Sequence, residues 1–429
     1  MATLLEDFDV LSEWTLGGSA SSGIAETTDT TGVYQSTKSL RFTLDNTTQD
    51  KYITKQVNWD LNGDDTLVLL VYNHKKYGGN ALGLQLYLAN STNMTGDTCL
   101  YTWSGDFAPG WNVFYFKQAG FTKYNSFTFA SAIQSIRVKI YGGSGFLRDF
   151  TVDSLWKGVH GRPKLVMGFD DGFSDHYTAH QYAVTKGIPM THYLEGSAID
   201  TASYLTSAQV REMALAGDAI CCHDGAQWDG SNGDSGQRMT EEKAALLSLG
   251  YVANHASFPQ GRYGQYDSDG ADINKSHLLN ARARFLSCRG TNTGVNLAIP
   301  EIANWYGGLR AHPLNNTCTL QQAKDYVDDL IRIGACGAFY GHQFGTADLT
   351  HWPQADFEAL CDYIATLRDD IDTITIPELY RTIAGEGPII PRNVNQNISI
   401  NDALYEGLRA AGFVGSVSDM KYQYLRGLS

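Results

Sequence analysis

The pattern of strand-like and helix-like segments changes near residues 158–163. Before this point, short runs rich in Val, Ile, Leu, Tyr and Phe alternate with turns rich in Gly, Asn, Asp and Ser. The clearest runs are residues 39–44, 66–72, 82–88, 111–116 and 133–141. Many short strands with frequent turns, and no segment with helical spacing, favour two packed sheets. We therefore expect residues 1–157 to form an all-β sandwich.

After residue 163, apolar strands such as residues 164–169 alternate with segments that have helical spacing. These segments are residues 207–216, 240–249, 320–333 and 354–367, and the first two begin with a Ser or Thr that is suited to capping. Strands alternating with helices predict an α/β layer or barrel over residues 158–385. Residues 386–429 read as a linker and a short helical hairpin, which is too small to be stable unless it packs on a neighbour.

The composition excludes several classes of partner. The chain has 32 Lys and Arg against 46 Asp and Glu, a net charge of −14, and no basic block. We therefore expect neither nucleic acid nor a membrane surface as a partner. The longest apolar runs are strand-sized, and the first residues lack the pattern of a secretory signal. The seven cysteines have no metal-type spacing and are expected to be mostly free thiols, in a protein made in a reducing cytoplasm.

Candidate catalytic residues gather after residue 157, where ten of the eleven histidines lie. Asp170, Asp171 and Gly172 directly follow the apolar strand at residues 164–169. Active sites in α/β folds collect at the carboxyl ends of strands, so both carboxylates are candidates for such a site. None of the other adjacent aspartate pairs of the chain follows a buried strand, and none of them precedes a glycine.

Three later segments repeat this arrangement of an apolar strand with a polar end. His223 follows residues 217–222, His342 follows residues 337–341, and a polar turn occupies residues 256–261. Each signal is weak alone, because a single histidine is usually a surface or core residue. Together, the four strand ends predict one shared rim of polar side chains.

The order of these motifs resembles that of the polysaccharide deacetylases of carbohydrate esterase family 4. The resemblance covers roughly residues 163–380 and rests on Phe169-Asp170-Asp171-Gly172, residues 204–217, His223, Phe258-Pro259-Gln260-Gly261, His342 and residues 357–380. It implies a distorted (β/α) barrel that removes acetyl groups from sugar polymers with the help of a metal, commonly zinc. It also implies that Asp171 and His223 bind the metal, that Asp170 is the general base and that His342 is the general acid.

This assignment is chemically consistent. A bound divalent metal lowers the pKa of water from about 16 to about 7 and polarises the acetyl carbonyl. Asp170 can take the proton of the attacking water, and His342 can protonate the departing amine or alkoxide.

The chain departs from the family pattern at three places, one of which is that no carboxylate can be assigned to support the acid histidine, His342. Gln227 stands where the family has a second metal-binding histidine, and glutamine is a poorer zinc ligand than imidazole. The candidates for completing the metal shell are Gln227, Asp224, Asp229, His176 and His180. The family's third motif often carries an arginine that orients the base, but Ala256 and Ser257 stand near that place, which leaves Arg262 or Arg310 as substitutes. A weakened or inactive site is therefore an open alternative.

Aromatic residues have two interpretations. Trp228, Trp305 and Tyr306 fall on predicted loops and either stack on sugar rings or pack in the interior. The sandwich either binds carbohydrate or serves as a spacer or oligomerisation domain. Its tryptophans at positions 14, 59, 103 and 111 belong either to a core or to a sugar platform.

The expected partner is an acetylated bacterial surface polysaccharide, such as a capsule. Such a substrate lies outside the cell, which suggests a bacteriophage tail protein that is carried on the virion and is a trimer if it is a tail spike. The last residues and a composition rich in Gly, Thr, Asn and Tyr agree with this location. Two alternatives stay open: a polysaccharide-binding adhesin on a deacetylase-like scaffold, and a glycosidase that uses two carboxylates about 5 to 10 Å apart.

Overall fold

The structure is a computed structural model of the 429-residue chain. It describes residues 3–18, 23–29, 33–34, 37–44, 49–61, 66–74, 79–107, 110–142, 148–157, 162–224, 235–261, 275–297, 304–306 and 309–384. The predicted linker and helical hairpin at residues 386–429 lie outside this part of the chain.

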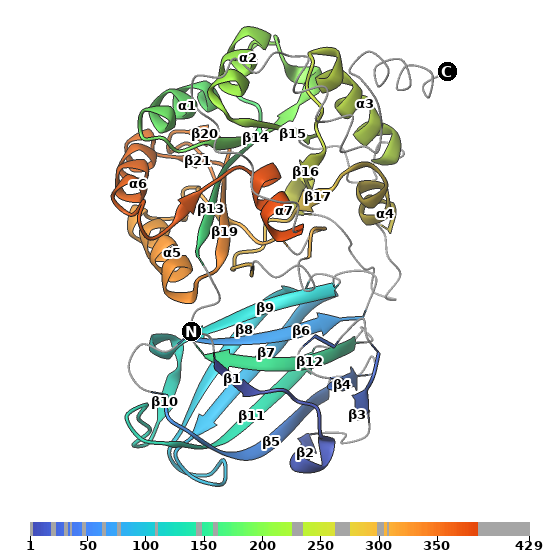
Figure 1. Ribbon diagram of the computed structural model, residues 1–429, viewed down its shortest axis with the longest axis vertical. Coiled ribbons are helices and arrows are strands. Elements are labelled where there is room, and N and C mark those ends of the chain that lie inside the picture. Colours follow the sequence, from blue (N-terminus) through green and yellow to red (C-terminus); the bar gives the residue numbers. More distant parts are fainter. Residues whose placement is uncertain are drawn as a thin grey trace.

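The amino-terminal region consists of two antiparallel sheets packed face to face (Figure 1). The first contains, in spatial order, β3 (Ile24–Thr27), β4 (Ser39–Leu44), β12 (Arg148–Lys157), β6 (Thr66–Asn73) and β9 (Gly110–Lys117), and β1 (Thr3–Glu6) also pairs with β12. The second contains β10 (Thr122–Tyr124), β8 (Thr98–Phe107), β7 (Gly79–Ala89), β11 (Ile133–Gly142), β5 (Gln49–Trp59) and β2 (Thr15–Gly18). The only helices in the described part of this region are the short 3-10 turns Leu11–Glu13 and Gln118–Gly120. The predicted all-β sandwich is confirmed.

Alternation of side chains places the core of the sandwich between its sheets. In β7, Leu84, Leu86 and Leu88 are fully buried, whereas Gln85 and Tyr87 between them face outward. Trp14 and Trp111 are buried, and Trp59 and Trp103 pack against the core. The contacts of these four tryptophans favour the core interpretation over a sugar platform.

The second region is built on a parallel sheet. Its spatial order is β17 (Ser287–Arg289), β16 (His255–Ser257), β15 (Ala219–His223), β14 (Met190–Glu195), β13 (Lys164–Asp171), β19 (Cys336–Gly341) and β18 (His312–Pro313), and β22 (Asp372–Thr373) also pairs with β13. A separate short pair is formed by β20 (Gln343–Phe344) and β21 (His351–Trp352). This sheet fits the predicted distorted barrel.

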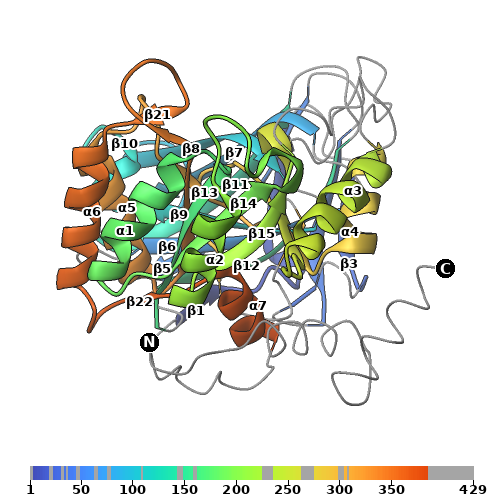
Figure 2. The ribbon, with the colours of Figure 1, turned by 90° about the horizontal axis from the view of Figure 1, so that it is seen from above.

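Helices surround the parallel strands (Figures 1 and 2). They are α1 (Asp175–Thr185), α2 (Ser207–Ala216), α3 (Ser235–Ser248), α4 (Lys275–Arg284), α5 (Leu320–Ile333), α6 (Gln354–Thr366) and α7 (Ile376–Ala384), with 3-10 turns at Gly196–Ala198 and Pro259–Gly261. Thr206 and Thr319 cap α2 and α5 through capping boxes with Gln209 and Gln322. Among the described residues, no helix is long and apolar enough to cross a bilayer.

One predicted helix start is wrong. The helix expected at residues 240–249 begins at Ser235, so Thr240 lies inside α3 and does not cap it. The Thr240 hydroxyl donates to the Gly236 carbonyl one turn earlier at 2.8 Å, a common arrangement for threonine within a helix.

The two regions share a hydrophobic core. Val68, Leu70, Trp111 and Val113 on the outer face of β6 and β9 belong to the same buried cluster as Phe339 and other side chains of the second region. The Asn304 amide donates to the Trp111 carbonyl at 3.0 Å, across the junction. The sandwich is therefore packed directly onto the α/β region.

All seven cysteines are buried and free of disulfides, as the sequence predicts. Burial raises the pKa of several of these thiols, to about 12 for Cys99 and Cys336, so they remain protonated and unreactive at neutral pH.

Candidate active site

Four parallel strands bring polar side chains to one edge of the sheet. Asp170 and Asp171 end β13, His223 ends β15 and Arg289 ends β17. His342 comes directly after β19, which is hydrogen-bonded to β13. Because the strands are parallel, their carboxyl ends meet at this edge.

Asp170 is buried and held by an arginine. Only 2% of the residue is exposed, and the Arg289 Nη2 lies 2.5 and 2.6 Å from its two carboxylate oxygens. Burial alone would raise the pKa of Asp170, but the charges of Arg289, His223 and His342 outweigh it and lower the pKa below its usual value. Asp170 is therefore a carboxylate at neutral pH.

The position of Arg289 is fixed from several sides. Its guanidinium lies 4.9 Å from the ring centroids of both Tyr193 and Tyr340, and its Nη1 donates to the Gly290 carbonyl at 2.7 Å. Sequence reasoning did not identify this residue. The signal was present, because Arg289 is a polar residue between the apolar segment at residues 285–288 and a glycine, like the other strand ends.

Of the two arginines proposed from the sequence, the one that the structure describes, Arg310, does not contact Asp170. Arg310 is buried at the junction with the sandwich, where its Nη2 donates to the Asn112 side-chain oxygen at 3.2 Å. Arg262 lies outside the described residues. The expectation for Arg310 is wrong because its guanidinium packs on the sandwich, 5.5 Å from the ring centroid of Trp103.

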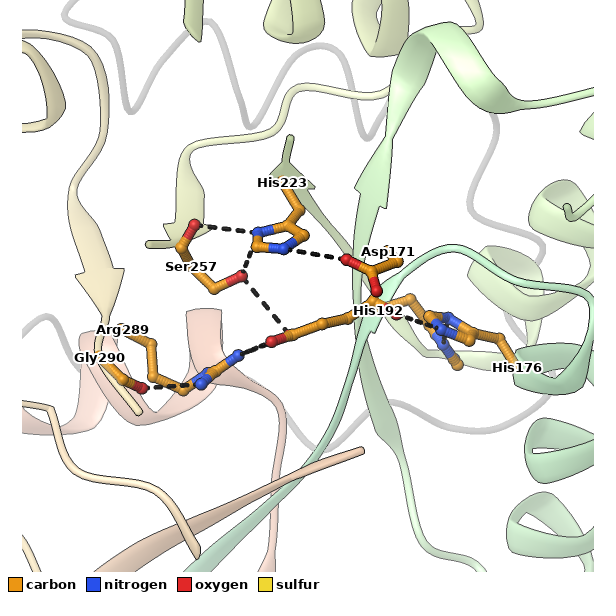
Figure 3. Close-up of polar contacts among 8 residues, drawn as sticks. Asp171, His176, His192, His223, Ser257, Arg289 and Gly290 are labelled. Atoms are coloured by element: carbon orange, nitrogen blue, oxygen red, sulfur yellow. Dashed lines mark hydrogen bonds and ion pairs between the residues drawn. The ribbon is translucent and has the colours of Figure 1, made fainter. Parts of the chain in front are cut away.

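The two adjacent carboxylates have different partners. Asp171 adopts a φ of 76°, and Gly172 follows with a φ of 88°, so the chain leaves the extended strand conformation there. Whereas Asp170 contacts Arg289, an oxygen of Asp171 lies 3.1 Å from Nε2 of His223 (Figure 3). A left-handed conformation is costly for a residue other than glycine and is typical of functional turns.

His223 is oriented by Ser257 on the neighbouring strand. Its Nδ1 donates to the Ser257 carbonyl at 3.1 Å and lies 2.8 Å from the Ser257 hydroxyl, which leaves Nε2 facing Asp171 (Figure 3). Burial opposes the charged ring, but the hydrogen bond to Asp171 and the charges of both aspartates raise the pKa of His223 to about 9. Without a metal, His223 and Asp171 therefore form an ion pair.

This pair also fits a divalent cation. An imidazole nitrogen and a carboxylate oxygen are both ordinary ligands of divalent cations such as zinc, and here they lie 3.1 Å apart. A metal-binding histidine commonly donates its other ring N–H to an oxygen, as His223 does to Ser257. Within the described residues, however, no cluster of three His, Cys, Asp or Glu side chains could hold a metal.

The described candidates for a third ligand are engaged elsewhere. The Nε2 of His176 donates to the Asp170 carbonyl, the Nδ1 of His180 contacts Asp218, and the Asp224 carboxylate pairs with Arg238. None of these three residues joins Asp171 and His223 in a cluster of described side chains that could hold a metal. Gln227 and Asp229 lie outside the described residues.

His342 lies at the same edge and is partly exposed. Its charge is close enough to contribute to the low pKa of Asp170, and its ring makes an edge contact of 5.9 Å with Tyr340. The Nδ1 of His342 is buried and has no hydrogen-bond partner among the described residues. The supporting carboxylate that the family resemblance implies is therefore not found in this part of the chain.

The two described aromatic residues proposed for sugar binding, Trp305 and Tyr306, pack against other side chains or backbone away from this edge. Trp305 packs on Tyr380 with ring centroids 4.7 Å apart, and Tyr380 also contacts His255, the first residue of β16. The Tyr306 hydroxyl donates to the carbonyl of Phe285, which precedes β17. These contacts lie toward the amino ends of the strands and favour packing for both residues. Trp228 lies outside the described residues.

Comparisons with known proteins give only distant similarities. No protein-family model matches the chain, and no curated protein sequence matches it. Solved structures with a similar fold include the Xyl-CE4 domain of a multidomain xylanase from the hindgut metagenome of Trinervitermes trinervoides (12% identity, 52% of this chain and 91% of that chain, TM-score 0.34). A family 4 acetyl xylan esterase from Clostridium thermocellum, in complex with a cobalt ion, is 17% identical over 51% of this chain and 90% of its own, with a TM-score of 0.32.

The solved structures also include a family 11 carbohydrate-binding module from Clostridium thermocellum, in complex with a mixed-linked tetrasaccharide. It is 12% identical over 36% of this chain and 94% of its own, with a TM-score of 0.28. At these identities and TM-scores, the similarities support no conclusion about the function of this chain.

Proposed function

We propose that the α/β region is a deacetylase that removes acetyl groups from a polysaccharide. In this proposal Asp170 is the general base, His342 is the general acid, and Asp171 and His223 hold a divalent cation, most simply zinc. The observation that carries the proposal is the divergence of two adjacent carboxylates: Asp170 contacts Arg289, while Asp171 contacts His223. One carboxylate is thereby available for proton transfer and the other for a cation.

The side chains of the site have charges that suit ester or amide hydrolysis. Asp170 has a lowered pKa and is ionised, so one of its oxygens can accept the proton of a water molecule that attacks the acetyl carbonyl. Arg289 keeps this carboxylate in one orientation, because its Nη2 contacts both carboxylate oxygens. His342, in its protonated form, can donate a proton to the sugar oxygen or nitrogen as the bond to the acetyl carbon breaks.

A divalent cation between Asp171 and His223 would supply a Lewis acid and a lower pKa for nearby water. Because the pKa of His223 is raised, the ring must lose a proton before Nε2 can act as a ligand, so metal binding competes with protonation. Ser257 keeps the ring in the tautomer that this requires, since it accepts from Nδ1.

A second candidate function is polysaccharide binding without catalysis. It is favoured by one observation: no third His, Cys, Asp or Glu joins Asp171 and His223 in the described part of the chain. A bacterial surface polysaccharide as substrate, and a location on a phage tail, are proposals that rest on the sequence features given above.

Release of acetate separates the two functions. The full chain is incubated with an acetylated bacterial polysaccharide, with zinc or with a chelator, and free acetate is measured. We expect release only with metal, and a loss of at least about a hundredfold in Asp170→Asn. Asp328→Asn, on α5, is the matched control and should retain activity. Polysaccharide binding without acetate release under any metal would favour the binding protein instead.

A further inference from the structure

A chain of buried polar side chains lies behind the Asp170–Asp171 turn. It joins Asp218, which precedes β15, to His192 on β14 and His176 on α1, and all three residues are at most 8% exposed. The Asp218 Oδ2 lies 2.9 Å from Nε2 of His192. Nδ1 of His192 lies 3.3 Å from Nδ1 of His176, and both rings are drawn in Figure 3. Nε2 of His176 then lies 2.7 Å from the carbonyl oxygen of Asp170.

The hydrogen bonds that link these buried side chains require one proton more than two neutral imidazole rings supply. The contact of His176 with the Asp170 carbonyl needs a proton on Nε2, because a carbonyl oxygen can only accept. The contact between the two Nδ1 atoms needs one proton, and the contact with Asp218 needs another. Three protons are required, whereas two neutral imidazoles carry two.

The third proton belongs on His192. Asp218 already accepts from the Met190 backbone N–H at 2.9 Å and from Nδ1 of His180 at 2.7 Å, which favours its carboxylate form. Burial raises the pKa of Asp218, but the hydrogen bonds from His180 and His192 lower it overall. Burial, together with the charge of His192, holds the pKa of His176 well below its usual value, so His176 is neutral.

The series of hydrogen-bonded side chains ends at the Asp170–Asp171 peptide, where the two carboxylate side chains diverge. Because Asp171 has a positive φ, the strand conformation ends there, and the Asp170 carbonyl receives its hydrogen bond from His176. The side chains on either side of this carbonyl contact Arg289 and His223. A shift of this peptide would move both.

We propose that His192 is a buried imidazolium that, through His176, positions the Asp170–Asp171 turn. Neither histidine touches the reacting atoms in this proposal, so both are positioning residues. The effect on catalysis rests on the proposed deacetylase function, whereas the charge of His192 does not depend on it.

The charge is tested by nitrogen NMR of the imidazole rings in the full chain at neutral pH. His192 should show two protonated ring nitrogens, and its signals are assigned by their loss in H192Q. His255 serves as an internal reference for a neutral buried ring, because burial lowers its pKa to about 3 and its Nδ1 is bonded to the Ser287 hydroxyl. A neutral His192 in the wild-type protein would overturn the proposal. Asp218→Asn should convert His192 to the neutral form.

The positioning role is tested by two substitutions of His176. H176Q keeps both a donor for the Asp170 carbonyl and an acceptor for His192, and should retain most of the kcat for acetate release. H176L keeps neither, and its kcat should fall about a hundredfold with little change in KM, because a displacement of about 1 Å in a catalytic group has an effect of this size. Equal kcat values for H176L and the wild type would overturn the role.

The two proposals fail in different ways. If the wild-type protein releases no acetate, the deacetylase proposal fails, but the NMR measurement still decides the charge of His192. If H176L does not fold, the comparison of H176Q with the wild type remains, and a hundredfold loss of kcat in folded H176Q would contradict the role.

Discussion

Replacing Arg289 with methionine is the sharpest test of how the site is held together. Methionine keeps much of the volume of arginine and removes its charge. The side chains of Arg289 and Asp170 are only 1% and 3% exposed, so water cannot replace the lost guanidinium. The substitution leaves a buried carboxylate without its main partner.

The expected loss of stability follows from this burial. Breaking a buried ion pair on one side typically costs about 3–5 kcal/mol, because the remaining charge is desolvated and unpaired. The double variant Arg289→Met/Asp170→Asn removes both charges, so it should recover much of the loss. Arg41 is the matched control: it makes two 2.7 Å bonds to Asp149, but a third of its side chain is exposed, and Arg41→Met should cost about 1 kcal/mol or less.

The loss of stability in Arg289→Met should also depend on pH, and it should become smaller as the pH falls. In the wild-type protein the pKa of Asp170 is lowered, so its stabilising contribution is present above about pH 4 and is lost as the pH falls through the folded pKa. Without Arg289, burial dominates and the folded pKa of Asp170 rises. The variant then gains stability as the pH falls toward 4, and the difference between the two proteins shrinks.

Urea unfolding of the wild type and the three variants, at pH 7 and near pH 4, measures these differences. A cost below about 1 kcal/mol at pH 7, equal to that of Arg41→Met, would refute the reasoning. So would a cost that does not change with pH.

Three further predictions concern the metal, the acid and the junction. The pKa of His223 is raised to about 9, so a proton must leave the ring before zinc can bind at neutral pH. The apparent zinc affinity measured by calorimetry should therefore weaken about tenfold for each unit of pH below 9. A pH-independent affinity would contradict a metal on His223. His342→Gln should lower kcat for acetate release at least about a hundredfold, and an unchanged kcat would remove His342 as the acid. Trp111→Ala should lower the free energy of unfolding in urea by about 3–5 kcal/mol, because Trp111 is buried in the core that joins the two regions. The control Tyr124→Ala, at an exposed site, should lower it by about 0.5 kcal/mol. A small loss for Trp111→Ala would show that the junction contributes little.

Strands with a long apolar pattern were predictable from the sequence. The runs expected at residues 39–44, 66–72 and 133–141 correspond to β4, β6 and β11, which differ from them by at most one residue. These strands bury at least one face, so the pattern of apolar residues follows directly from their packing.

Arg289 was not predicted, because its strand is too short to be recognised. β17 has three residues and follows α4 after two others, so the apolar segment before Arg289 is too short to mark a strand. The burial of Arg289 comes from more distant strands of the sheet, since Tyr193 and Tyr340 lie on β14 and β19. Such tertiary contacts between distant segments are not encoded in local spacing.

The histidines of α1 show a second limit. His176 and His180 are one turn apart, so the sequence places both on the same face of the helix. Whether that face meets the interior of the sheet or the polar edge depends on how α1 packs. In the structure both rings point into the interior, where they contact Asp170, His192 and Asp218.

Acetate release during a zinc titration tests the central claim most directly. Zinc is added stepwise to the chelator-treated full chain in the presence of acetylated polysaccharide. We expect the rate to rise with zinc and to saturate for the wild type, and to stay near zero for Asp171→Asn, which lacks one of the two proposed cation ligands. Equal zinc-dependent rates in both proteins, or a wild-type rate that does not respond to zinc, would contradict a cation held between Asp171 and His223.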